Sequence, residues 1–291
     1  MIEIKGANMK INFTISCTDD KKLAASKYTP DKINTHKLIV INSALGVKQS
    51  FYEPLAMYLS EHGFTVITWD PRGIGLSSQS NIKNDQSKLR EWGQLDLTAL
   101  LDLIAAKQWA DWQNITLIGH SAGGHLIGLC PRIKYLQKVI LICSGTCAWH
   151  LYPKVHQPKL LLAWHLVFPL LYKTIGYVPN KFGIGHALPK GVARDWRKWS
   201  LNKNYLFGDN SLGEHFYASY KGQLDAIGFS DDNGFSPKKT IDDLVKRFTS
   251  AHSKIEIFEP YQFQRKSIGH FGFFKANNEH IWQQLILSKL T

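Results

Sequence analysis

The sequence predicts an α/β fold built on a mostly parallel, doubly wound sheet. From residue 37 onward, apolar runs rich in β-branched residues alternate with segments of helical spacing. The apolar runs are nearly continuous, as is typical of strands that helices cover on both faces. Strands separated by helices pair in parallel through right-handed crossovers, so these observations together indicate one wound sheet. A length of 291 residues suits a single such domain that carries an insertion.

Each expected core strand is an apolar, mostly β-branched run that a turn-forming residue ends. Residues 10–30 precede the regular part of the chain and contain a strand, a turn and a second short strand or loop. The core strands expected after them cover residues 37–44, 64–70, 114–120, 138–145, 223–232 and 253–260.

The expected helices lie between these strands and carry apolar residues at helical spacing. They cover residues 50–63, 87–109, 122–136, 236–248 and 277–290. Gly63 is a typical stop for the first of them. Pro131 disturbs the third, because proline lacks the amide hydrogen that a helix interior uses.

The alternation breaks between residues 146 and 219, where the pattern favours helices and loops. This stretch is rich in tryptophan and holds nine Lys or Arg side chains against three carboxylates. We expect it to be a helical cap (lid) of residues 146–219, inserted into a core formed by residues 1–145 and 220–291.

Composition points to an ordered globular protein, with 44% hydrophobic and 20% charged residues. The net charge of +12 is scattered, so we expect a solvated basic surface and no nucleic-acid partner. A basic, amphipathic cap also leaves open a weak contact with an anionic membrane surface. The longest apolar stretch, residues 160–172, is too short to span a bilayer, and no secretory signal begins the chain. We therefore expect a cytoplasmic protein with reduced, buried cysteines.

The pentapeptide Gly119-His120-Ser121-Ala122-Gly123 follows an apolar strand and precedes helix-compatible residues. A strand that turns sharply into a helix holds its central residue in a strained conformation, and flanking glycines remove the side chains that would clash. The Ser121 hydroxyl would then stand at the carboxyl edge of the sheet, beside the positive end of a helix. The alternative is a small residue in a tight turn.

Four motifs in order make the chain resemble the α/β-hydrolase superfamily, and within it a bacterial group of predicted serine hydrolases of undefined substrate. They are "DPRGIGLSS" (70–78), "GHSAGG" (119–124), "SDDNGFSP" (230–237) and "IGHFGFF" (268–274). The resemblance runs from about residue 30 to the end of the chain. It implies a nucleophile, an acid and a histidine in that chain order.

On this resemblance, Ser121 is the nucleophile and His270, after the last core strand, is the base. His280 lies within the last expected helix, and the side chain of His120 should point away from its neighbour Ser121. The acid is one of the adjacent pair Asp231 and Asp232, and Asp232 is preferred because it lies deeper in the turn.

The oxyanion hole needs two backbone N–H donors. Ala122, directly after the nucleophile, would supply one. The superfamily often has His-Gly in the loop that supplies the other, whereas this chain reads Asn-Ser-Ala-Leu-Gly over residues 42–46. Backbone donors do not depend on side-chain identity, so Ala44 or Leu45 remains available for this role.

These features predict a serine hydrolase that cleaves a carboxylic ester or thioester of a small-molecule acyl substrate. Trp164, Trp196 and Trp199 are the candidates to line an apolar acyl pocket, unless they only pack the cap onto the core. No dinucleotide, P-loop or metal-ligand motif occurs, so we expect no cofactor and no metal. The alternatives are an amidase or acyltransferase with the same three residues, or a non-catalytic ligand-binding protein.

Overall fold

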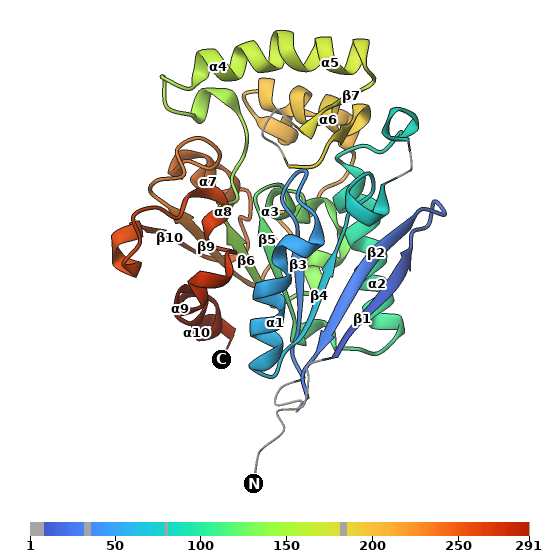
Figure 1. The fold of residues 1–291 in the computed structure, drawn as a ribbon, viewed down its shortest axis with the longest axis vertical. Helices are drawn as coiled ribbons and strands as arrows, with labels where there is room; N and C mark the ends of the chain where they lie inside the picture. The colour runs from blue at the N-terminus through green and yellow to red at the C-terminus, as the bar shows by residue number, and fades with distance from the viewer. Residues whose placement is uncertain (1–8, 32–35, 79–80, 181–184, 291) are drawn as a thin grey trace.

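The computed structural model describes residues 9–31, 36–78, 81–180 and 185–290. Its centre is an eight-stranded sheet with the strand order β1-β2-β4-β3-β5-β6-β9-β10 (Figure 1). β1 and β2 run antiparallel to their neighbours, and the other strands pair in parallel. The strands are β1 Met9–Ser16, β2 Lys22–Thr29, β3 Leu38–Asn42, β4 Thr65–Trp69, β5 Ile115–His120, β6 Lys138–Ile142, β9 Gln223–Phe229 and β10 His252–Phe258.

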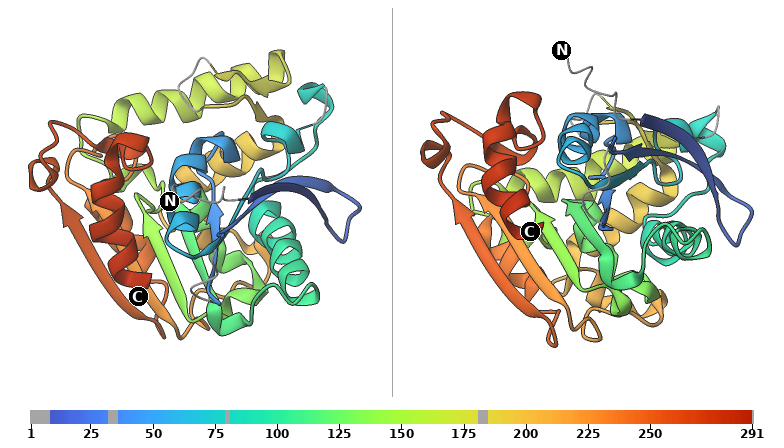
Figure 2. Two further views of the ribbon diagram at one scale, coloured as in Figure 1. Left: turned by 60° about the horizontal axis from the view of Figure 1, so that its bottom comes forward. Right: turned by 90° about the horizontal axis from the view of Figure 1, so that it is seen from below.

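Helices connect these strands and flank the sheet (Figure 2). The α-helices are α1 Glu53–Glu61, α2 Thr98–Ala106, α3 Ala122–His125, α4 Gln157–Leu162, α5 Phe168–Thr174, α6 Lys190–Leu201, α7 Lys238–Val245, α8 Gly269–Gly272, α9 Glu279–Trp282 and α10 Ser288–Leu290. A two-stranded ribbon, β7 Tyr177–Val178 and β8 Leu188–Pro189, lies between α5 and α6 in the chain. The predicted mostly parallel, doubly wound sheet is therefore confirmed.

Two hydrophobic cores, one on each face, hold the sheet between its helices. Leu38 and Val40 of β3 belong to the core that contains the apolar residues of α2 and α7. Ile39 and Ile41 belong to the other core, together with the apolar residues of α1 and α9. Successive side chains of a strand point to opposite faces, so a continuous apolar run is what a sheet covered on both faces requires.

The expected helix over residues 122–136 is much shorter in the structure. α3 ends at His125, and short 3₁₀ turns follow at Ile127–Leu129 and Pro131–Tyr135. Cys130 is extended, with ψ 121°, because the ring of Pro131 disfavours helical backbone in the residue before it.

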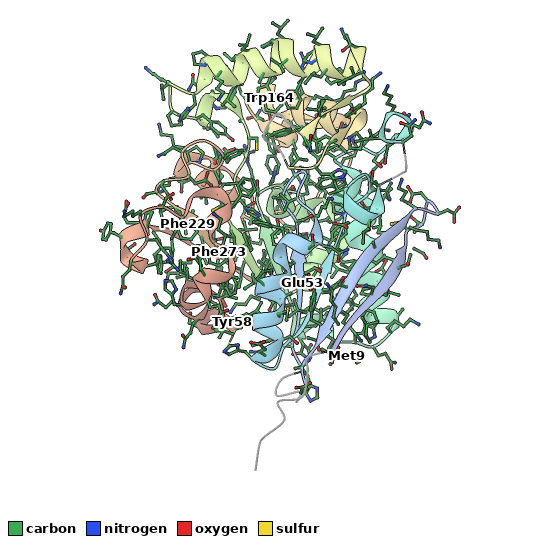
Figure 3. All side chains as sticks on the ribbon, viewed as in Figure 1. Met9, Glu53, Tyr58, Trp164, Phe229 and Phe273 are labelled. Carbon is green, nitrogen blue, oxygen red and sulfur yellow. The ribbon has the colours of Figure 1, made fainter. Side chains whose placement is uncertain are left out.

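The chain between β6 and β9 forms a helical layer above the carboxyl ends of the strands (Figure 1). α4, a π-helical turn over Ala163–Val167 and α5 follow one another without a break to form one long helix, residues 157–174. α6 lies beneath this helix, with Trp164 between them (Figure 3). The guanidinium of Arg90 fixes α6 to the loop before α2 through two hydrogen bonds to Asp195, of 2.9 and 2.7 Å. No helix in the described ranges is long and apolar enough to cross a membrane.

Candidate active site

Ser121 occupies a strained turn at the end of β5. Its φ of 50° and ψ of −119° lie where side chains other than glycine are rare. The turn is held on both sides, because the Ser121 N–H donates to the carbonyl of Ile142 in β6 at 3.1 Å and its own carbonyl accepts from Gly124 at 2.9 Å. Strain of this kind persists only where the surroundings fix it, and it clusters at functional sites.

The glycines of the pentapeptide are needed because backbone comes close to them. A Cβ on Gly119 would lie 2.5 Å from the Cα of Gly124, across the turn. A Cβ on Gly123 would lie 2.4 Å from the backbone oxygen of Asn42, at the end of β3. Neither contact leaves room for a side chain, which explains the spacing of glycines around Ser121.

His270 lies in α8, after the parallel strand β10 has brought the chain to the same edge of the sheet. Its Nδ1 lies 2.6 Å from Oδ2 of Asp232, and both side chains are buried. A carboxylate only accepts hydrogen bonds, so Nδ1 carries the hydrogen and Nε2 keeps a free lone pair in the neutral imidazole. In the described part of the chain, the Ser121 hydroxyl makes no hydrogen bond. Catalytic hydrogen bonds often form only when substrate is bound.

Asp231, the other member of the pair, binds the backbone of the His270 loop instead of the imidazole. Its carboxylate accepts hydrogen bonds from the N–H groups of Ile268, at 2.9 Å, and Gly269, at 3.0 Å, and from the Ser267 hydroxyl at 2.8 Å. Burial alone would raise the pKa of Asp231, but these donors outweigh it and lower the pKa below its usual value. Of the two adjacent carboxylates, Asp232 therefore binds the imidazole and Asp231 holds the backbone of the loop.

A buried chain of hydrogen bonds joins three loops of the site. The Ala44 N–H donates to the Tyr52 hydroxyl at 2.8 Å, and that hydroxyl lies 2.8 Å from Nδ1 of His120. Nε2 of His120 lies 2.9 Å from the His270 carbonyl. A carbonyl only accepts, so Nε2 donates and Nδ1 accepts from Tyr52. Burial and the nearby His270 imidazole hold the pKa of His120 well below its usual value, which keeps this ring neutral.

This chain of hydrogen bonds occupies one of the two N–H groups predicted for the second oxyanion donor. The Ala44 N–H is already committed to Tyr52, so it is not free for a ligand. In the described structure the Leu45 N–H makes no hydrogen bond. The Ala122 N–H is the first of α3, ahead of the amides that bond within the helix. The N–H groups of Leu45 and Ala122 are therefore the candidate donors that remain available.

Cys143 follows β6 at the same edge of the sheet. It is fully buried, has a φ of 46°, and its sulfur lies within 4.8 Å of ligand atoms of Asp232 and His270. Burial raises the pKa of its thiol well above the usual value. Two zinc ligands lie roughly 3.3 Å apart in a tetrahedral site. The 2.6 Å between Asp232 and His270 suits a shared hydrogen better than a metal ion.

Aromatic rings enclose the His270 imidazole. Phe235 stacks on it with centroids 4.7 Å apart, and Phe271 meets it edge-on at 4.9 Å. Phe235 is 46% exposed, so it presents an apolar surface to solvent directly beside the imidazole. Sequence reasoning missed Phe235 and Tyr52. The only signal for Phe235 was its place in the motif that carries Asp231 and Asp232.

The remaining candidates are three tryptophans of the helical layer and His280 of α9. Trp164, Trp196 and Trp199 belong to the interior of the helical layer, where Trp164 and Trp196 meet edge-to-face at 4.6 Å. Trp199 is fully buried and donates its indole N–H to Asp209 at 2.8 Å. Nε2 of His280 lies 3.2 Å from the carbonyl oxygen of Phe263.

Comparison with known proteins places this architecture. Residues 33–260 match the family described as serine aminopeptidase S33 (Hydrolase_4). The mouse protein "Serine hydrolase BPHL" is 28% identical over 108 residues, which cover 36% of this chain and 35% of that protein. The human protein of the same name is 27% identical over the same share. The chain thus aligns with about a third of the length of these curated relatives.

Solved structures share the fold across nearly the whole chain. A soluble variant of monoglyceride lipase from Saccharomyces cerevisiae, in complex with a substrate analog, has a TM-score of 0.63 at 15% identity and covers 99% of this chain and 98% of its own. A Pyrococcus furiosus esterase has a TM-score of 0.61 at 13% identity, with 97% and 90% covered. At such identities the likeness shows the fold alone.

Proposed function

Because the chain belongs to the serine aminopeptidase S33 family of α/β hydrolases, we propose that it is a serine hydrolase of small acyl esters or thioesters, with Ser121, His270 and Asp232 as its catalytic residues. The observation that carries this proposal is the 2.6 Å contact between Asp232 and His270 at the edge of the sheet where Ser121 occupies its strained turn. A base that an acid orients is what a serine needs to act as a nucleophile.

The reaction follows from these groups. Ser121 Oγ attacks the substrate carbonyl while Nε2 of His270 takes its proton, and Asp232 stabilises the imidazolium. The N–H groups of Ala122 and Leu45 bind the oxyanion of the tetrahedral intermediate. His270 returns the proton to the leaving alcohol or thiol, and an acyl group remains on Ser121. Water then attacks this acyl-enzyme by the same route and releases the acid.

The charges around the site favour esters over the peptide amino termini that the family's description names. An aminopeptidase needs a carboxylate for the substrate's ammonium group. The sequence has no Asp or Glu between residues 112 and 194, which includes most of the helical layer. Asp195 and Asp209 of that layer are paired with Arg90, and Asp231 and Asp232 hold the His270 loop. The layer's third carboxylate, Glu214, is exposed to solvent after α6.

We assign the helical layer, residues 146–219, the role of a cap over this edge of the sheet. Phe235, exposed beside the imidazole, would contact the acyl chain close to the reacting carbonyl. The tryptophans inside the layer would shape the cap from within. This arrangement suits an uncharged, apolar acyl group, and no step of the reaction requires a cofactor.

The test is labelling with a fluorophosphonate probe, followed by a panel of p-nitrophenyl esters, acyl thioesters and aminoacyl anilides. Wild-type protein should be labelled and should hydrolyse the esters or thioesters. Ser121→Ala should lose both properties, whereas Ser219→Ala, at an exposed serine of the helical layer, should keep them. Labelling that survives Ser121→Ala would place the nucleophile elsewhere. Wild-type protein that stays unlabelled and inactive would favour a non-catalytic binding protein, and turnover of only the anilides would favour an amidase.

A further inference from the structure

The long helix over residues 157–174 is apolar on two opposite sides. Its inner side carries Trp164, Phe168 and Tyr172, all buried, and Trp164 and Phe168 pack on Trp196 of α6. These residues are spaced four apart, which places them on one face of a helix.

The outer side carries a second apolar row with the same spacing. Leu162, Leu166 and Leu170 are 56%, 58% and 56% exposed. Each lies two residues before a member of the inner row, an offset of about 200° around the helix axis. A helix that is apolar all round is normally buried on every side. Among the described residues, this one is covered only from beneath (Figure 3).

The exposed row is the main concentration of such residues in the described chain. Val155, just before the helix, is 79% exposed and adds to it. Four of the eleven exposed large hydrophobic residues thus fall within residues 155–170, while others, such as Met57 on α1 and Tyr261 after β10, occur singly. Scattered apolar residues are ordinary on protein surfaces, but a continuous apolar row marks an interaction site.

The charges around the row define its partner. Lys154, Lys159 and Lys173 are exposed at the two ends of the long helix. With no Asp or Glu between residues 112 and 194, no carboxylate on this helix balances them. Lysines that flank an apolar helix face are the pattern of helices that lie in the interface of anionic lipids.

We propose that the outer face of the helix over residues 157–174 docks on an anionic lipid surface, with the three leucines among the acyl chains and the three lysines at the headgroups. A second copy of this chain is a poorer occupant, because a two-fold contact would bring two uncompensated lysine sets together. Docking here would hold the carboxyl edge of the sheet, with Ser121 and His270, toward the lipid. The docking itself does not depend on the proposed chemistry.

The first test is flotation with vesicles of phosphatidylcholine alone or with 30% phosphatidylglycerol. Wild-type protein should float with the anionic vesicles. The variant Leu162→Gln/Leu166→Gln/Leu170→Gln should lose about tenfold or more in partitioning. Met57→Gln, at an isolated exposed residue, is the matched control and should bind like wild type. The variant Lys154→Gln/Lys159→Gln/Lys173→Gln should bind both kinds of vesicle equally weakly. Unchanged circular dichroism would show that each variant is folded.

The second test reports insertion directly. Brominated lipids in anionic vesicles should quench the fluorescence of the tryptophan introduced by Leu166→Trp. In Met57→Trp, the quenching should be no greater than that of the native tryptophans in the wild-type protein. Anionic binding that ignores the leucine substitutions would mean adsorption by net charge alone and would overturn the proposal. The absence of vesicle binding would also overturn it. A protein that does not bind vesicles but forms a dimer through these leucines, detected by sedimentation, is one such outcome.

Discussion

The imidazole of His120 donates a hydrogen bond from Nε2 to the backbone carbonyl of His270, at 2.9 Å. These residues are 150 positions apart in the sequence, and the bond ties the turn that carries Ser121 to the loop that carries the base. His120 can do this because Tyr52 donates to its other nitrogen and fixes the tautomer. The side chain of His120, next to the proposed nucleophile, therefore positions the loop of His270 by binding the backbone of that loop.

Replacing Tyr52 by Phe should weaken this connection. The change leaves Nδ1 of His120 and the Ala44 N–H buried without partners, which should lower the free energy of unfolding by about 1–3 kcal/mol. Urea unfolding measures the effect. Tyr135→Phe, at a tyrosine that is 44% exposed, is the control and should change little. Equal stability of the two variants would show that the buried chain contributes nothing.

Replacing Asp232 by Asn should reduce kcat while leaving the fold intact. An amide in place of the carboxylate cannot stabilise the imidazolium and can present its N–H₂ group to Nδ1, which favours the wrong tautomer. Loss of such an acid lowers turnover by about 10⁴-fold. Ester hydrolysis measures the effect, with Asp242→Asn on the exposed surface of α7 as the control. Near-normal turnover in Asp232→Asn would remove this residue from the proposed mechanism.

Replacing Asp231 by Asn should change the dependence of stability on acid. The folded protein lowers the pKa of Asp231, so the unfolded chain binds its proton more readily. Its stabilisation is therefore present above the ordinary pKa of about 3.9 and is lost as the pH falls below that value. Wild type should be more stable than Asp231→Asn at pH 6, and the difference should shrink toward pH 3. Urea unfolding at both values checks this, and a gap that stays constant or widens would contradict it.

Replacing Gly123 by Ala should destabilise the protein more than an ordinary surface change. The added Cβ would come within 2.4 Å of the Asn42 oxygen, and neither backbone segment can move freely. Overpacking of this kind costs about 1–3 kcal/mol or more. Thermal and urea unfolding measure it. Gly234→Ala is the matched control, because a Cβ there meets nothing within 4 Å.

Local patterns carried most of the fold. The six parallel strands of the main sheet were predicted within a few residues, because a continuous apolar run between turns is itself the requirement for a strand covered on both faces. The short strands β7 and β8 were not predicted. The turn at Ser121 was predictable for a similar reason, since the glycines that permit it are its immediate neighbours. The helix after it was expected over residues 122–136 with a disturbance at Pro131, but α3 ends at His125, before the residue that Pro131 restricts.

The sequence by itself determined the order of strands and helices, the strained serine turn and the loop of His270, because each depends on residues a few positions apart. Only the tertiary structure decided that Asp232 binds the imidazole while Asp231 binds the loop, and that the Ala44 amide is taken by Tyr52. Adjacent residues of the same type differ only in the direction in which their side chains point. That direction is set by the residues that the rest of the chain packs against these side chains. For the two carboxylates, those residues lie more than 30 positions away in the sequence.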